Sequence, residues 1–231
     1  TALTEQNPFG VTGIQAATPA NLRGQIRAVL SAFEVRAVKT GMLFSKELIE
    51  TVADSLDGLD IPLIVDPVMI STSGSRLLRE DAIESLMTRI LPRAAVITPN
   101  RMEAELLTGM TIRSLGDMES AARLCREKFG CGSVIKGGHS ESGEEAADVC
   151  LFGDEPLILR SPRLNLPELT THGTGCTFSS ALAAGVAKGL DLPDAARNAK
   201  HFVYASLLCH VRTGADLHSM FPPNLRKGFA D

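Results

Sequence analysis

The stretch that decides the fold is IPLIVDP, residues 61 to 67, an apolar run that ends in an aspartate and a proline. The runs AAVITP (94 to 99) and SVIKGG (133 to 138) have the same character. None of the three alternates cleanly between apolar and polar residues, which is typical of strands buried on both faces of a sheet. The sequence therefore predicts parallel strands with helices covering both faces.

Two more strands are predicted at VTGIQAA (11 to 17) and VRAVKTG (35 to 41). Apolar residues at helical spacing predict the connecting helices, at 20 to 33, 46 to 57, 80 to 91 and 117 to 129. Such alternation is typical of parallel strands joined by crossover helices. AADVCLFGDEPLILR (146 to 160) predicts an antiparallel hairpin with a Gly-Asp turn at the sheet edge. Two helices, about 175 to 189 and 194 to 212, follow it.

The composition favours one α/β domain that binds a small molecule. The 231 residues are 44% hydrophobic and 22% charged, which is enough to bury a full core, and we expect a single domain over 1–231. The net charge is -4 and there is no run of Lys or Arg, so the sequence shows no basic patch of the kind that binds nucleic acid or an anionic membrane. Nothing in the sequence resembles an apolar span or a signal peptide. The five cysteines lack paired spacing, which indicates reduced thiols and a cytoplasmic protein.

Polar side chains fall at the ends of the predicted strands. These residues are Lys39, Asp66, Asn100 and Lys136. In open parallel sheets, ligands bind outside the carboxyl ends of the strands. The sequence therefore predicts a ligand site at that edge of the sheet.

The segment THGTGCTFSSALAAG (171 to 185) places a cysteine in a glycine-bracketed turn at the start of a helix. Such a helix N-terminus binds anions, and a thiol there tends to be more acidic than usual. Cys176 could then accept a proton, or it could simply pack in a close turn. The helix is expected to bury one stripe, formed by Phe178, Ala181, Leu182, Gly185 and Val186.

Asn100 and Glu103 follow a strand directly in TPNRMEAELL (98 to 107). Their spacing places both on one helix face, where an amide oxygen and a carboxylate suit Mg²⁺. The same pattern is also a capping box, which only satisfies the first N–H groups of the helix.

The remaining candidates each have an ordinary explanation beside the functional one. Lys136, next to two glycines, could reach phosphate oxygens or could simply be solvated. Asp66 could face a metal or a basic group, although Asp-Pro is also a common turn signal. His172 is interpreted as structural. Taken together, an anion loop, a metal-type pair, a lysine and a carboxylate at one sheet edge indicate phosphoryl transfer.

Several stretches carry a family resemblance. They are QNPFGV (6 to 11), VKTGML (38 to 43), VDPVM (65 to 69), ITPNRMEAELL (97 to 107), VIKGGH (134 to 139) and THGTGCTFSSALAAGVAKG (171 to 189). In this order the chain resembles the phosphomethylpyrimidine kinases, a branch of the ribokinase-like superfamily. The resemblance implies a central, mostly parallel sheet with helices on both faces. It also implies a homodimer that uses ATP and Mg²⁺ to phosphorylate 4-amino-5-hydroxymethyl-2-methylpyrimidine, and then its monophosphate, in thiamine biosynthesis.

The resemblance also implies roles for matching residues. Cys176 takes the place of the proton acceptor, which is an aspartate in many sugar kinases of the superfamily, and Gly173, Thr174 and Gly175 form the anion hole. Asn100 and Glu103 match the motif that holds Mg²⁺, partly through water, and Lys136 matches the lysine near the nucleotide phosphates. Asp66 is a further candidate for the metal from its place at a strand end. Gln6 hydrogen-bonds the aminopyrimidine, and the residues that match those around the ring are Thr4, Met42 and Val68.

The front of the chain departs from this family. The chain opens on TALTEQN, which reads as the end of a strand running into a loop. Kinases of the family usually begin with a strand and a glycine-rich segment, similar to GSDSGGGAGIQAD, that supplies a carboxylate to the pyrimidine. We therefore expect either that such a segment precedes Thr1 or that the truncated protein is unstable or inactive. We also expect a sheet that lacks the N-terminal strand in these residues.

The sequence leaves two alternative functions open. A pyridoxal kinase of the same branch shares the cysteine-bearing turn, but Gln6 and Lys136 favour the pyrimidine. A truncated paralogue could bind ligand without catalysing a reaction. Against it stands the intact set of Cys176, Asn100, Glu103 and Lys136, which binding alone would not require.

Overall fold

The computed structural model of the protein describes residues 1–69, 77–138, 144–167, 171–214 and 217–223. Its centre is a six-stranded sheet of order β3-β4-β5-β6-β7-β8. The strands are β3 (Val38–Thr40), β4 (Leu63–Val65), β5 (Val96–Ile97), β6 (Gly132–Lys136), β7 (Glu145–Leu151) and β8 (Pro156–Pro162). Strands β3 to β6 are parallel, whereas β7 and β8 are antiparallel to their neighbours. The predicted mostly parallel sheet and its edge hairpin are confirmed.

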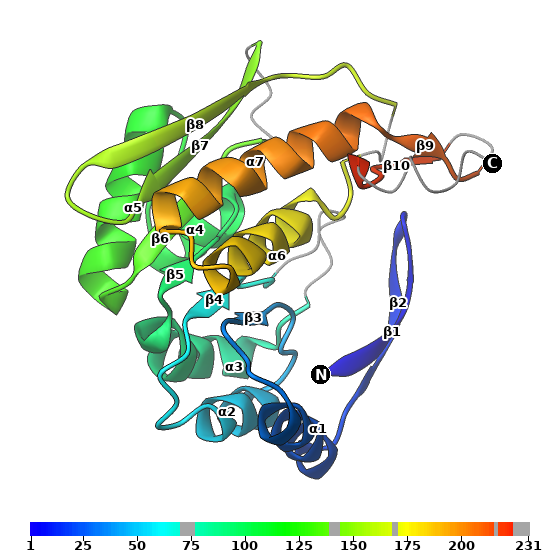
Figure 1. Ribbon diagram of the computed structural model, residues 1–231, viewed down its shortest axis with the longest axis vertical. Helices are drawn as coiled ribbons and strands as arrows, with labels where there is room; N and C mark the ends of the chain where they lie inside the picture. The colour runs from blue at the N-terminus through cyan, green and yellow to red at the C-terminus, as the bar shows by residue number, and fades with distance from the viewer. Residues whose placement is uncertain (70–76, 139–143, 168–170, 215–216, 224–231) are drawn as a thin grey trace.

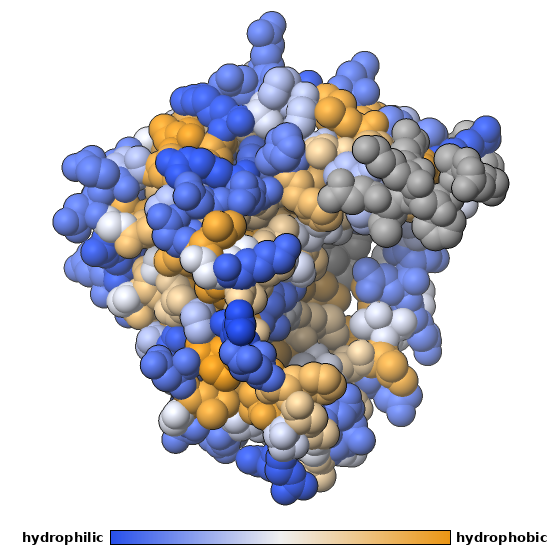
Figure 2. All heavy atoms as spheres, viewed as in Figure 1, coloured by the Kyte–Doolittle hydropathy of each residue, from blue (hydrophilic) through white to orange (hydrophobic). Residues whose placement is uncertain are grey.

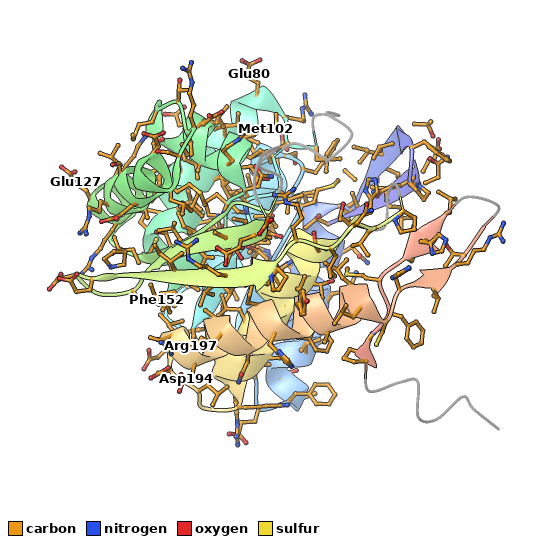
Figure 3. The ribbon with its side chains drawn as sticks, turned by 90° about the horizontal axis from the view of Figure 1, so that it is seen from above. Glu80, Met102, Glu127, Phe152, Asp194 and Arg197 are labelled. Atoms are coloured by element: carbon orange, nitrogen blue, oxygen red, sulfur yellow. The ribbon has the colours of Figure 1, made fainter. Side chains whose placement is uncertain are left out.

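Helices cover both faces of the sheet (Figure 1). The layer on one face contains α2 (Lys46–Ser55), α3 (Glu80–Ser85), the π-turn η1 (Leu86–Ile90), the 3-10 turn η2 (Leu91–Arg93), α4 (Arg101–Thr108) and α5 (Leu115–Phe129). Helix α1 (Pro19–Ala32) packs outside α2. The other face carries α6 (Thr174–Ala187) and α7 (Leu192–Leu208). In Figure 3, Glu80 and Met102 of the first layer lie on the opposite side of the sheet from Asp194 and Arg197 of α7.

The strands alternate between these two layers residue by residue. In β4, Val65 packs with the α2–α5 layer, whereas Ile64 packs with α6 and α7. Ile135 and Val134 of β6 divide in the same way. Because both faces need apolar side chains, these strands show no polar alternation, as the sequence predicts. None of the described helices is long and apolar enough to cross a membrane.

The prediction for the strand at residues 11 to 17 was wrong about the strand with which it pairs. Residues 11 to 17 were expected in the parallel sheet, but β2 (Gly10–Ala16) pairs antiparallel with β1 (Ala2–Asn7) in a separate two-stranded sheet. The opening stretch is therefore itself a strand. The physical reason is a tight turn in which Asn7 Oδ1 accepts a hydrogen bond of 2.8 Å from the Phe9 N–H. The hairpin stands beside the body of the molecule in Figure 1.

Two predicted helices end earlier than expected. The helix predicted at 80 to 91 leaves α-geometry after Ser85 and continues as η1 and η2, with Pro92 in η2. The last helix ends at Leu208 instead of 212, because β9 (Val211–Arg212) pairs with β10 (His218–Ser219). Strand pairing satisfies backbone groups that a longer helix would have used.

The buried stripe of α6 gives a direct test of this architecture. Leu182 is 0% exposed and packs between α7 and the sheet, whereas Leu106 on α4 is 44% exposed. Leu182→Ala should lower the free energy of unfolding by about 2 to 5 kcal/mol, because it leaves a cavity in the core. The matched variant Leu106→Ala should change it by about 0.5 kcal/mol or less. Urea unfolding measures both, and equal losses would contradict the assigned core.

Candidate active site

A cavity of about 350 Å³ opens at the carboxyl ends of β4, β5 and β6. Most of the predicted site residues line it: Gln6, Asp66, Val68, Asn100, Glu103, Lys136, Gly173, Thr174, Gly175 and Cys176. His172 lines it as well. Figure 2 shows the molecule hollowed between the β1–β2 hairpin and the main body. The sheet edge predicted from the sequence is therefore the edge that carries the cavity.

The centre of the cavity is a buried ion pair between Asp66 and Lys136. Lys136 Nζ lies 2.8 Å from Asp66 Oδ1, and the two side chains are 14% and 3% exposed. The same carboxylate accepts hydrogen bonds from Thr98 Oγ1 at 3.3 Å and from Ser179 Oγ at 3.2 Å. The carboxylate of Asp66 therefore joins side chains from β6, from the residue after β5 and from α6.

Pairing lowers the pKa of Asp66 and raises the pKa of Lys136, so each shift favours the charged form of the side chain. Burial alone would raise the pKa of Asp66, but the charge and hydrogen bond of Lys136 lower it. Burial alone would lower the pKa of Lys136, but the carboxylates of Asp66 and Glu103 raise it. At neutral pH both members of the pair are therefore charged.

The turn before α6 packs directly against the lysine. Gly173 caps α6 with φ of 79°, a conformation that favours glycine. A Cβ atom on Gly175 would lie only 2.9 Å from Lys136 Nζ. Glycine at 175 therefore lets the ammonium group reach the N-terminal turn of α6, which has no side-chain cap among the described residues.

Cys176 lies in the same turn and is exposed. Its thiol lies near enough to the Asp66 carboxylate for the two groups to influence each other's pKa. Partial burial of the thiol, followed by the negative charge of Asp66, raises the pKa of Cys176 above its usual value of 9.0. The expectation of an unusually acidic thiol is wrong, because burial and the Asp66 carboxylate together outweigh the positive charges of Lys39 and Lys136.

Asn100 and Glu103 form a complete capping box at the start of α4. Asn100 Oδ1 accepts from the Glu103 N–H at 2.9 Å, and Glu103 Oε2 accepts from the Asn100 N–H at 2.9 Å. Glu103 Oε1 accepts from the Met69 N–H at 3.1 Å. Glu103 is 2% exposed, and burial raises its pKa.

The side chains of Asn100, Glu103 and Asp66 fit a Mg²⁺ ion that keeps several of its water ligands. No group of three or more His, Cys, Asp or Glu side chains that could hold a metal occurs in the part of the chain that the structure describes. Both Glu103 oxygens already accept backbone N–H groups. Mg²⁺ commonly keeps several waters and uses one or two carboxylates together with substrate phosphates, so these residues fit such an ion.

Of the other predicted contacts, two line the cavity and two do not. Gln6 and Val68 line the cavity, and Val68 adopts a φ of 38°, which is strained for a β-branched residue. Thr4 and Met42 are not among the lining residues. Thr4 Oγ1 donates to Gln6 Oε1 at 3.3 Å, and the Met42 carbonyl accepts from Thr1 Oγ1 at 2.5 Å.

Sequence reasoning missed two partners of Asp66. Ser179 is a fully buried serine on the apolar face of α6, and Thr98 is a fully buried threonine after β5. A polar residue within an apolar stripe is the signal that could have drawn attention to Ser179, since buried hydroxyls need partners.

A family model described as phosphomethylpyrimidine kinase matches residues 1–221. The chain belongs to the phosphomethylpyrimidine kinase family. The hydroxymethylpyrimidine/phosphomethylpyrimidine kinase of Synechococcus elongatus is 42% identical over 207 residues, which are 90% of this chain and 78% of the relative.

Two solved structures extend the comparison. A phosphomethylpyrimidine kinase from Clostridium difficile has a TM-score of 0.76 at 33% identity, covering 88% of this chain and 83% of its own. An ADP complex of Bacillus subtilis pyridoxal kinase has a TM-score of 0.85 at 30% identity, covering 97% and 84%. The ribokinase-like fold expected for a phosphomethylpyrimidine kinase is thereby confirmed, and the chain is a kinase.

The Asp66–Lys136 pair gives a pH-dependent test. Asp66→Asn leaves Lys136 as an unpaired buried charge and should cost about 3 to 5 kcal/mol of unfolding free energy at neutral pH. The double variant Asp66→Asn/Lys136→Met, which removes both charges, should recover most of this loss.

The loss should depend on pH in one direction. Because folding lowers the pKa of Asp66, its contribution is present above the usual value of 3.8 and disappears as the pH falls through the folded value. Urea unfolding from pH 7 down to pH 3 should therefore show the gap between wild type and Asp66→Asn closing. A gap that stays constant over this range would contradict the pairing.

Proposed function

We propose that the protein transfers the γ-phosphoryl group of ATP to 4-amino-5-hydroxymethyl-2-methylpyrimidine, and then to its monophosphate, in thiamine biosynthesis. One observation carries the proposal: the Lys136 ammonium lies between the Asp66 carboxylate and the Gly175 turn of α6, with Cys176 beside it. Phosphoryl transfer depends mainly on positioned charge, and this arrangement supplies it.

The α6 turn is the proposed anion hole. Gly173, Thr174 and Gly175 line the cavity at the N-terminus of α6, where the Thr174 N–H donates to the Thr171 carbonyl and no side chain caps the helix among the described residues. The N–H groups of a helix N-terminus bind phosphate without bringing a negative charge close to it. Lys136 then neutralises the phosphate oxygens, because its ammonium keeps its charge through the pair with Asp66.

Cys176 is the proposed proton acceptor. As the bond from the γ-phosphorus to ADP breaks and the bond to the substrate oxygen forms, the hydroxyl proton passes to Sγ. The raised pKa means that the thiol is protonated at neutral pH, so its own proton must first leave. The exposed thiol loses this proton to solvent, because the lowered pKa of Asp66 keeps the neighbouring carboxylate ionised.

Mg²⁺ is the proposed metal, held near Asn100, Glu103 and Asp66. When bound, the ion supplies charge neutralisation to the phosphates. Glu103 contributes a fixed negative charge, because its carboxylate is held by the N–H groups of Met69 and Asn100. With both carboxylate oxygens so engaged, contact with the ion through water is favoured over direct coordination.

The pyrimidine is proposed to bind at the hairpin end of the cavity. Gln6 presents an amide acceptor and donor to an aminopyrimidine edge, and Val68 packs against the ring. Thr4 supports Gln6 through its hydrogen bond. Met42 stays a proposed ring contact from the family resemblance.

We also propose a homodimer. Four large apolar side chains of the hairpin and α1 are at least half exposed: Leu3, Phe9, Val29 and Phe33. Exposed apolar residues on neighbouring elements favour an interface over solvent. We propose that the protein is cytoplasmic, because its five cysteines are free thiols and thiols stay reduced in that compartment.

Pyridoxal phosphorylation is the second candidate, favoured by the TM-score of 0.85 to a pyridoxal kinase. A coupled ADP-release assay with the hydroxymethylpyrimidine, its monophosphate and pyridoxal separates the candidates. Turnover with the first two should exceed turnover with pyridoxal. Faster turnover with pyridoxal would replace the proposal, and no turnover with any of them would reject catalysis.

Removal of the Cys176 thiol should lower kcat. We expect Cys176→Ala to reduce kcat roughly 10²- to 10⁴-fold with little change in ATP affinity, since a general base acts only in the reaction step. Wild-type kcat should rise with pH toward and beyond 9.0, because the deprotonated form accepts the proton and its pKa is raised. The variant should lose this pH dependence.

The matched control is Cys209→Ala, which alters a cysteine at the C-terminal end of α7 that does not line the cavity. Its kcat should stay within about twofold of wild type. Near wild-type turnover in Cys176→Ala would return Cys176 to a packing role.

Replacement of Gln6 should lower kcat/KM more for the pyrimidine than for pyridoxal. Gln6→Leu removes the amide that faces the pyrimidine, so kcat/KM for the pyrimidine should fall about 5- to 100-fold. The loss for pyridoxal should be smaller, because pyridoxal lacks the aminopyrimidine edge. Gln15→Leu, an exposed glutamine on β2, is the matched control. Equal losses for both substrates in Gln6→Leu would contradict the assignment.

A further inference from the structure

Lys39, the middle residue of β3, is a partly buried lysine close to the proposed reacting groups. It lies opposite Ile64 in the parallel register of β3 and β4, and Ile64 packs with α6 and α7. Register partners on neighbouring strands share a face of the sheet, so the Lys39 side chain lies on the α6 side. Cys176 belongs to the first turn of that same helix.

The Lys39 ammonium lies beside Gly41 and near the wall of the cavity. A Cβ atom on Gly41 would lie 3.0 Å from Lys39 Nζ and 3.9 Å from Cγ2 of Val68, which lines the cavity. Burial acts to raise the pKa of both Asp66 and Cys176, and the positive charge of Lys39 acts to lower both. Lys39 itself is not a lining residue, but its long flexible stem lets the ammonium advance toward a charged ligand.

The ammonium of Lys39 has no hydrogen bond or salt bridge to any residue that the structure describes. Asp66 does not need it, because this carboxylate already accepts hydrogen bonds from Lys136 and from two hydroxyl groups. A partly buried ammonium without a protein acceptor is completed by water or by a ligand. An anionic ligand at this end of the cavity would supply the acceptors.

The two proposed phosphoryl acceptors differ in charge at this place. The hydroxymethylpyrimidine brings a neutral hydroxyl group, whereas its monophosphate brings a charge of about -1.5 to -2 at pH 7. In the second transfer an ionised phosphate oxygen forms the new bond to the γ-phosphorus, and the bond from that phosphorus to the ADP oxygen breaks. No proton has to leave the acceptor. Two phosphate groups must approach each other, however, and a cation beside the acceptor offsets their repulsion.

We propose that Lys39 binds the phosphate of the monophosphate substrate and thereby favours the second transfer. The inference rests on the proposed function, which gives both the alcohol and its monophosphate as acceptors. Lys136 has a different task, because it is paired with Asp66 beside the Gly175 turn, where the transferred phosphoryl group is proposed to bind. Lys39 acts on the acceptor instead.

Calorimetric titration with the hydroxymethylpyrimidine and with its monophosphate, in the absence of ATP, tests the inference without relying on turnover. Lys39→Met should bind the monophosphate about 10- to 100-fold more weakly than wild type, the loss of a hydrogen bond to a charged group. The alcohol should bind within about threefold of wild type, because it offers no charge to the ammonium. Lys39→Arg keeps the positive charge and should retain most of the affinity for the monophosphate.

Two further variants control for fold and for net charge. Lys39→Gln keeps a polar side chain without the charge, and it should show the same selective loss as Lys39→Met. Lys188→Met removes an exposed lysine at the C-cap of α6, the end of the helix away from Cys176, and should bind both ligands as wild type does. Thermal unfolding establishes that each variant is folded at the temperature of the titration.

The outcomes separate the inference from the proposed function. If the two neutral variants weaken binding of both ligands equally, or of neither, Lys39 does not recognise the phosphate and the inference is overturned. A wild type that binds the alcohol but not the monophosphate would overturn the inference and leave the first transfer standing. A wild type that binds neither ligand would overturn the proposed function and the inference with it.

Discussion

The buried ion pair between Asp66 and Lys136 is the interaction on which the rest of the site depends. Its two residues follow β4 and end β6, strands that are separated by β5, and the 2.8 Å contact spans that gap. Two charges so deeply buried are stable only with good geometry and further hydrogen bonds. Thr98 and Ser179 provide them, and Ser179 also ties the pair to the first turn of α6. The sheet and the anion-binding turn are thereby fixed to each other.

The same pair gives the two cavity carboxylates different properties. Asp66 bonds directly to the Lys136 ammonium, and its pKa is lowered despite burial. Glu103 feels Lys136 only through space and accepts two backbone N–H groups, and burial raises its pKa. One carboxylate is thus strongly anionic beside the thiol of Cys176, whereas the other is a rigid group at the start of α4. Such divergence between neighbouring acids is common where groups have separate tasks.

Much of the fold could be predicted from the sequence, because the core strands and helices are encoded locally. The runs around Ile64, Val96 and Val134 are apolar on both faces, and the capping box at Asn100 marks the start of α4. The partner of β2 could not be predicted, since apolar alternation does not say which strand pairs with which. The cavity edge was predicted from strand ends. The raised pKa of Cys176 was not predicted, because it depends on burial of the thiol and on the charge of Asp66, which is 110 positions earlier in the chain.

A crystal structure of the protein with ADP tests the central claim most directly. The account predicts the terminal phosphate against Gly175 at the N-terminus of α6, with Lys136 Nζ within hydrogen-bond distance of both a phosphate oxygen and Asp66 Oδ1. A phosphate bound away from this turn, or a lysine that leaves Asp66 entirely to face solvent, would contradict it.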